Sequence, residues 1–158
     1  MAATKQPTGT ISGTRPRTGR VLIVDDDAAA AGAMGTALAL AHEVTVLSDA
    51  TQAVALVADG ARFDVILYDF TMHGMNGAEY FARLCAASVR QAARIVFLGG
   101  GTVPLGLAEF LSRVSNPFVQ RPVDVEALRA LVDRRVAEEL ARNAPASSSQ
   151  PGGSSQTG

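Results

Sequence analysis

The chain has 158 residues, of which 47% are hydrophobic, and its formal net charge is −1 at pH 7. This length fits about one ordinary domain, and the apolar fraction is enough to bury a core. The balanced charge gives no indication of nucleic acid or an anionic membrane as a partner. The single cysteine, Cys85, excludes an intrachain disulfide, and no apolar run reaches the ~20 residues of a membrane helix. We therefore expect a cytoplasmic protein without a membrane partner.

Both ends of the sequence differ in composition from its centre. Residues 1–19 are rich in Thr, Gly and Pro, and residues 143–158 are almost entirely Ala, Pro, Ser, Gly and Gln. Neither segment has enough apolar surface to offset the entropy lost on ordering. We predict that both are disordered tails around one folded domain at 20–142. Two alternatives stay open, a stand-alone chain or a domain excised from a longer protein, and the initiator Met and the two tails favour the first slightly.

Strand and helix patterns alternate along the domain. Short runs rich in β-branched residues predict strands, and longer runs with apolar residues at helical spacing predict helices. In chain order, the predicted strands are 21–24, 44–47, 63–68, 94–98 and 118–120. The predicted helices that follow them are 28–41, 50–58, 78–86, 105–114 and 125–142, the last capped by Asp124. Five βα units with short connections predict an α/β fold with a five-stranded, doubly wound parallel sheet.

Two of the predicted strands end in aspartate. The first is followed by Asp25, Asp26 and Asp27, and the third is followed by Asp69. Parallel strands bring their carboxyl ends to one edge of the sheet, where such folds bind ligands. If the two strands are neighbours, the carboxylates converge there and, uncompensated, raise one another's pKa. Capping of the first helix explains any one of the three consecutive aspartates, but three in a row exceed what a cap needs.

A hard divalent cation is the simplest way to hold such carboxylates together. Mg²⁺ prefers carboxylates, a carbonyl and several waters in octahedral geometry. Asp26, Asp69 and the backbone carbonyl of Thr71 could supply three positions, with Asp25 reaching the ion through water. A carboxylate beside such an ion is able to accept a phosphoryl group, because the metal neutralises charge on the incoming oxygens.

The order of these motifs resembles the receiver domain of bacterial two-component response regulators. The likeness rests on the Asp25-Asp26 pair, on Asp69, on the loop 72–77 with its Met-x-x-Met-x-Gly pattern, and on Arg121-Pro122 after the last strand. It covers roughly residues 19–142. It implies a flavodoxin-like (βα)5 sheet with strand order 2-1-3-4-5.

The resemblance also implies roles. Asp69 would accept a phosphoryl group from a histidine kinase or phosphotransfer protein, and no separate enzymatic activity is expected. Asp25, Asp26, Asp69 and the Thr71 carbonyl would bind Mg²⁺, and Asp27 would be an additional helix cap. The signal would pass to a downstream protein partner rather than to nucleic acid, with homodimerisation through the last helices as a further expectation.

Four positions depart from the family pattern. The fourth strand normally ends in Ser or Thr, whose hydroxyl bonds the phosphoryl group, but here Gly99 takes that place and Thr102 lies too far along. The family has Lys before the proline that follows the fifth strand, whereas this chain has Arg121. The planar guanidinium of arginine differs from the compact ammonium group of lysine as a hydrogen-bond donor. The aromatic residue of the fifth strand, which changes rotamer with the switch, is Phe118 and has no hydroxyl. In the loop 72–77, His73 takes the place of the family's usual proline. We interpret it as a solvated residue and not as a catalyst or ligand.

Three functions remain open at this point. The complete acidic pocket favours a phosphoacceptor receiver, whereas Gly99 and Arg121 favour a pseudo-receiver that acts as a protein-interaction module without phosphorylation. A small hydrolase with an aspartate nucleophile would need a cap insertion for which the chain has no room. The run 99–101 is a weak phosphate-binding signal and is more typical of a flexible turn. The bond between Arg121 and Pro122 is cis in the family, and we expect the same here.

Overall fold

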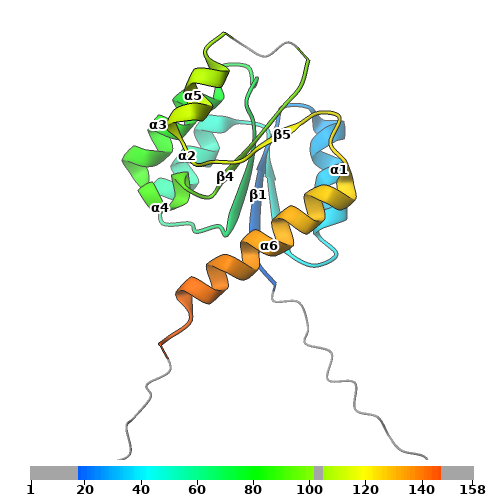
Figure 1. Cartoon of the computed structure of the whole chain (residues 1–158), viewed down its shortest axis with the longest axis vertical. Helices are drawn as coiled ribbons and strands as arrows, with labels where there is room; N and C mark the ends of the chain where they lie inside the picture. The colour runs from blue at the N-terminus through cyan, green and yellow to red at the C-terminus, as the bar shows by residue number, and fades with distance from the viewer. Residues whose placement is uncertain (1–17, 102–104, 147–158) are drawn as a thin grey trace, which may run out of the picture.

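A computed structural model describes residues 18–101 and 105–146 and contains one five-stranded sheet between two layers of helices (Figure 1). The strands are β1 (Arg20–Val24), β2 (Glu43–Leu47), β3 (Val65–Asp69), β4 (Ile95–Gly99) and β5 (Phe118–Gln120). The helices are α1 (Ala28–Leu38), α2 (Ala50–Ala58), α3 (Gly77–Ala87), α4 (Val89–Ala92), α5 (Leu107–Arg113) and α6 (Val125–Asn143). All paired strands are parallel, in the order β2-β1-β3-β4-β5. The predicted fold class and strand order are confirmed.

The sheet is buried on both faces. Successive residues of a strand point to opposite sides, so each strand contributes to two cores. In β1, Leu22 and Val24 face the core formed with α2, α3, α4 and α5, whereas Val21 and Ile23 face the core formed with α1 and α6. All four side chains are fully buried. Because helices cover both faces, the ends of the strands are where a site is able to form.

Side-chain caps fix where five of the six described helices begin, among them α1, α3 and α6. Asp27 accepts hydrogen bonds from two backbone N–H groups in the first turn of α1, both at 3.0 Å. Asn76 caps α3 at 2.9 Å, and Asp124 caps α6 at 3.0 Å. Such a cap contributes about 1 kcal/mol relative to alanine. The capping roles predicted for Asp27 and Asp124 are confirmed.

The structure differs from the predicted elements at several boundaries. The strand β3 includes Asp69 as its last residue, so this side chain is held by the sheet and not by a loop. The helix α1 ends at Leu38, where the N–H of His42 bonds the Leu38 carbonyl at 3.0 Å and turns the chain toward β2. The four-residue helix α4, capped by Ser88, was not predicted because it is too short to show a helical period.

A buried histidine ties the start of the domain to the last helix. The side chain of His42 is 2% exposed, and its Nδ1 accepts a hydrogen bond from the Gly19 N–H at 3.2 Å. Its Nε2 lies 2.7 Å from a carboxylate oxygen of Asp133 in α6. Most of the two tails predicted from composition lies outside the described residues, as does Thr102. Within the described ranges, no helix is both long and apolar enough to span a membrane.

Candidate functional site

Three aspartates meet where the carboxyl ends of β1 and β3 lie side by side. One carboxylate oxygen from each of Asp25, Asp26 and Asp69 lies within 4.8 Å of the other two. Asp25 follows β1 directly, and its own N–H bonds the Leu47 carbonyl at 3.0 Å, which fixes it beside β2. Asp25 is 1% exposed and Asp69 is 8% exposed, whereas Asp26 lies at the surface. The structure therefore brings together the three carboxylates singled out in the sequence.

Both carboxylate oxygens of Asp25 have partners. The Oδ1 atom accepts a hydrogen bond from the Asp27 N–H at 2.9 Å, and the Oδ2 atom forms an ion pair with the guanidinium of Arg121. The backbone N–H of Arg121 donates to the Gly99 carbonyl at 2.7 Å, and the Arg121-Pro122 bond is cis, as the resemblance implied. A buried carboxylate without a partner would be costly. Arg121 thus compensates Asp25 from the end of β5.

Asp69 is engaged through one oxygen only. Its Oδ1 atom accepts hydrogen bonds from both the N–H and the hydroxyl of Thr71, each at 3.0 Å. Its Oδ2 atom has no hydrogen-bond partner in the part of the chain that the structure describes. Thr71 therefore orients the carboxylate and leaves one oxygen available to a ligand.

Asp26 is paired with His73 from the loop after β3. The Nδ1 atom of His73 lies 2.7 Å from Oδ2 of Asp26, and the His73 backbone N–H donates to the same oxygen at 3.1 Å. These bonds hold the pKa of Asp26 below its ordinary value, and the carboxylate raises the pKa of the His73 imidazole. The imidazole is 98% exposed, which agrees with a solvated residue. Its contact with Asp26 was missed, because no sequence pattern links two residues 47 positions apart.

The donor set fits a small, hard divalent cation. All three side chains offer carboxylate oxygens, which are the ligands that Mg²⁺ prefers. The free oxygen of Asp69 is the least committed ligand. At the other two carboxylates a cation would have to share the site with Arg121 and His73. The cluster is therefore a suitable cation site in which two neighbouring cationic or polar groups compete with the ion.

The loop between β3 and α3 is held over the site by specific contacts. Gly74 has a φ of +86°, a conformation that favours glycine. The Tyr68 hydroxyl donates to the Met75 carbonyl at 2.7 Å. At Gly77, an ideal Cβ would lie 2.2 Å from the ring of Phe70, so only glycine fits beneath that ring. The Gly of the Met-x-x-Met-x-Gly pattern is thus explained by packing.

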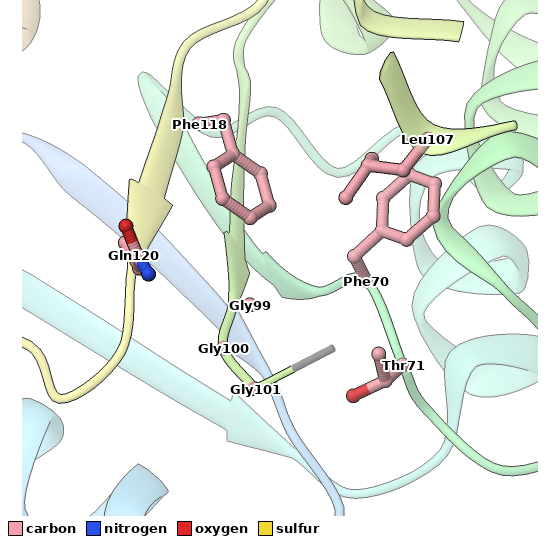
Figure 2. A pocket seen from close by; sticks show the side chains of 8 residues that line it. All are labelled: Phe70, Thr71, Gly99, Gly100, Gly101, Leu107, Phe118 and Gln120. Atoms are coloured by element: carbon pink, nitrogen blue, oxygen red, sulfur yellow. The ribbon is translucent and has the colours of Figure 1, made fainter. Parts of the chain in front are cut away.

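The position that a side chain of residue 99 would take lies beside a phenyl ring. An ideal Cβ at Gly99 would lie 3.0 Å from the Cε2 and Cζ atoms of Phe118. Figure 2 shows this ring next to the glycine, with Phe70 and Leu107 on the other side of a small cavity. The cavity has a volume of about 70 Å³, and Thr71 also contributes to its lining. The two departures at Gly99 and Phe118 are therefore in contact with each other.

Known proteins share this sequence pattern and this arrangement. The signature of the response regulator receiver domain matches residues 21–133. The chain is 28% identical over 127 residues to the transcriptional regulatory protein FixJ of Bradyrhizobium diazoefficiens, an alignment that covers 79% of this chain and 61% of FixJ. It is 31% identical over 125 residues to the DNA-binding response regulator MtrA of Mycobacterium tuberculosis, covering 78% of this chain and 51% of MtrA. A solved CheY-like receiver domain protein of Methanospirillum hungatei is 26% identical with a TM-score of 0.65, over 79% of this chain and 98% of that one.

The chain belongs to the response regulator receiver domain family, because the family signature covers most of its length. The strand order β2-β1-β3-β4-β5 and the acidic cluster at the carboxyl edge agree with this membership. The chain spans 61% of the length of FixJ and about half of the length of MtrA. The resemblance stated from the sequence motifs is confirmed.

Proposed function

We propose that this protein is a phosphoacceptor in two-component signal transduction and that Asp69 takes the phosphoryl group. The observation that carries the proposal is the state of the Asp69 carboxylate. Thr71 orients one of its oxygens, and the other has no partner in the described chain. The Asp69 carboxylate as a whole lies in a cluster with those of Asp25 and Asp26. A positioned carboxylate with a free oxygen beside a cation site is what covalent capture of a phosphoryl group requires.

The reaction would transfer the group from a phosphohistidine of a kinase or phosphotransfer protein. The free Oδ2 of Asp69 attacks phosphorus, the P–N bond of the phosphohistidine breaks, and the histidine nitrogen leaves with the electron pair and takes a proton. The product is an acyl phosphate on Asp69. A Mg²⁺ ion bound by Asp25, Asp26, Asp69 and the Thr71 carbonyl would neutralise charge on the phosphoryl oxygens.

The remaining residues would act on the phosphorylated state. Arg121 is able to donate to a phosphoryl oxygen from the end of β5, although it must share its guanidinium with Asp25. No hydroxyl is available from Gly99, so one hydrogen bond to the phosphoryl group is absent, worth about 1.5–3 kcal/mol for a charged acceptor. We infer that this weakens the coupling of phosphorylation to Phe118 more than it weakens phosphorylation itself.

The output would be a contact with another protein. The names of FixJ and MtrA describe a transcriptional regulator and a DNA-binding regulator, and the aligned part of each covers only 61% and 51% of its length. The near-neutral charge of this chain, −1 at pH 7, gives no reason to propose nucleic-acid binding by the receiver itself. We propose a downstream protein partner instead.

The proposal is tested by recording backbone amide spectra with Mg²⁺, first alone and then with beryllofluoride, a mimic of the phosphoryl group. We expect Mg²⁺ to shift the amide signals of Asp25, Asp26 and Asp69, and beryllofluoride to shift in addition the signals of the loop at Thr71. Shifts that stop there would mean binding with weak switching, whereas shifts that reach Phe118 and α6 would mean a full switch. No response to either ligand, with Asp69→Asn behaving like the unmodified chain, would support the pseudo-receiver alternative.

A further inference from the structure

The opposite edge of the sheet, where the strands begin, carries positive charge around a recess. This recess has a volume of about 500 Å³ and is lined by four arginines. Arg20 opens β1, Arg62 lies in the segment before β3, Arg90 lies in α4 and Arg94 directly precedes β4. The short helix α4 and the C-terminal end of α6 lie near each other at this lower edge (Figure 1). The recess is thus at the far end of the strands from the three aspartates.

Carboxylates neutralise only part of this charge. Arg20 lies 3.6 Å from Glu43, and Arg94 lies 2.6 Å from Glu139 in a largely buried ion pair. Glu139 is shared, because Arg142 also lies 2.8 Å from it. These two carboxylates therefore serve three guanidinium groups.

Arg62 and Arg90 have no carboxylate partner within 4.0 Å among the described residues. The Arg90 guanidinium donates to the neutral side chain of Asn143 at 3.1 Å. Asp64 also lines the recess, where one oxygen accepts the Arg20 backbone N–H at 2.8 Å. Four arginines and Asp64 line the recess, and Glu43, Glu139 and Arg142 are joined to them by ion pairs. This set of five guanidinium groups and three carboxylates has a surplus of two positive charges. Residues 1–17, 102–104 and 147–158 contain no Asp or Glu, so no side chain there supplies the missing charge.

Backbone carbonyls hold three of the arginine side chains in place, and some of their N–H donors remain free to bind a ligand. Nη1 of Arg62 donates to two backbone carbonyls, at 2.8 and 3.1 Å, which leaves its Nε and Nη2 donors without a partner in the described chain. Nη1 of Arg20 donates to the Arg62 carbonyl at 2.9 Å, and Nη1 of Arg94 donates to the Phe63 carbonyl at 2.7 Å. Side chains that are already fixed lose little entropy when a ligand binds.

We propose that this recess binds a small soluble anion that carries phosphate groups. The surplus of two positive charges matches such an anion, and the planar guanidinium fork bonds two phosphate oxygens at once. A volume of about 500 Å³ lies in the range of small-molecule sites, roughly 300–1,000 Å³. Concave shape and fixed arginines favour a small molecule over a flat macromolecular surface. Without a bound cation, the three carboxylates at the other end of the strands repel the same ligand, so under these conditions only the recess is expected to bind it.

The test uses the full chain and inorganic pyrophosphate, titrated by calorimetry at fixed ionic strength with a metal chelator present. We expect saturable binding of one pyrophosphate, and we expect Arg90→Gln to weaken it by at least about tenfold, the effect of losing one charged hydrogen bond. Arg90 bonds only the Asn143 side chain, so this variant should fold normally. Arg83→Gln, in α3 and paired with Glu79, is the matched control and should bind like the unmodified chain.

Two further measurements locate the binding site, one on the Asp69→Asn variant and one on the amide signals. Asp69→Asn should leave pyrophosphate binding unchanged, because the recess does not depend on the phosphoryl site. Amide shifts on titration should centre on Arg62, Gln91 and Arg94. The proposal is overturned if binding is absent, if it is lost equally in Arg83→Gln and Arg90→Gln, or if the shifts centre on Asp69. It is likewise overturned if a phosphoserine peptide binds there and pyrophosphate does not.

Discussion

The ring of Phe118 covers the position at which Gly99 lacks a side chain. An ideal Cβ on Gly99 would lie 3.0 Å from two ring atoms, which is closer than ordinary van der Waals contact. The two residues come from neighbouring strands, since β4 pairs with β5. The absence of a hydroxyl at position 99 and the position of the Phe118 ring are therefore linked, because any side chain at position 99 requires the ring to move.

Gly99→Ser tests this relationship. The ring must shift by a few tenths of an ångström, and the cavity of about 70 Å³ beside it gives it room. We expect a loss of about 1 kcal/mol in the free energy of unfolding, at the low end for an overpacked core. Urea denaturation measures it. In a Phe118→Ala background the serine should be neutral, and an equal loss in both backgrounds would show that the ring is not the obstacle.

Gly77→Ala should be more damaging than the change at Gly99. Its Cβ would lie 2.2 Å from the Phe70 ring, which is fixed by edge contacts to Phe97 and tilted packing on Phe110 at centroid distances of 5.5 and 5.6 Å. We expect a loss near the upper end of about 1–3 kcal/mol, again by urea denaturation. Gly32→Ala is the matched control, because nothing lies within 4 Å of a Cβ there. It should stabilise α1 by up to about 1 kcal/mol, and an equal loss in both variants would contradict the packing argument.

The sequence predicted the parts of this fold that depend on local pattern. Apolar runs located all five strands, and Asp25 and Asp69 could be placed at one edge because parallel strands share their direction. It did not predict the helix α4, whose four residues make about one turn of 3.6 residues and so show no repeating pattern. It also did not predict that β3 holds Asp69 as its last residue, because strand ends depend on pairing with Leu98 in β4.

Side-chain partnerships at the site could not be predicted. Arg121 and Asp25 are 96 residues apart, and His73 and Asp26 are 47 apart. Such pairs depend on loop geometry and rotamers, which leave no periodic trace in a sequence. The resemblance identified Gly99 and Phe118 as unusual one by one, but only the fold brings them into contact.

Arg121→Gln should destabilise the protein and make its stability more sensitive to Mg²⁺. The Asp25 side chain is fully buried and that of Arg121 is 25% exposed, so we expect a loss of about 1–3 kcal/mol without divalent cations, below the value for a fully buried pair. Added Mg²⁺ should reduce this loss, because the ion supplies the missing positive charge. Thermal or urea unfolding with and without Mg²⁺ measures both effects.

The control for that experiment is Arg113→Gln. Its ion pair with Glu109 is exposed, with side-chain exposures of 72% and 66%, so little change in stability is expected with or without Mg²⁺. If Arg121→Gln lost the same stability at every Mg²⁺ concentration, the ion would not be binding beside Asp25.

His73→Ala should raise the affinity for Mg²⁺ by a small factor. The imidazole and the backbone N–H of His73 both bond Oδ2 of Asp26, so removing the ring leaves this oxygen with the backbone N–H alone and opens one side of it to the ion. Asp26 stays ionised at neutral pH, because the contact with His73 only lowers a pKa that is already acidic. Calorimetric titration with Mg²⁺ measures the change, with Arg83→Gln as the control. Unchanged or weaker binding in His73→Ala would mean that the ring does not compete with the ion.

Direct phosphorylation of Asp69 tests the central claim. The full chain is incubated with Mg²⁺ and acetyl phosphate, and the intact mass and peptide fragments are recorded beside those of Asp69→Asn. We predict one added phosphoryl group, located on Asp69, removed by hydroxylamine and absent from Asp69→Asn or when Mg²⁺ is chelated. A folded chain that gains no phosphoryl group, or an Asp69→Asn variant that gains it equally well, would contradict the account.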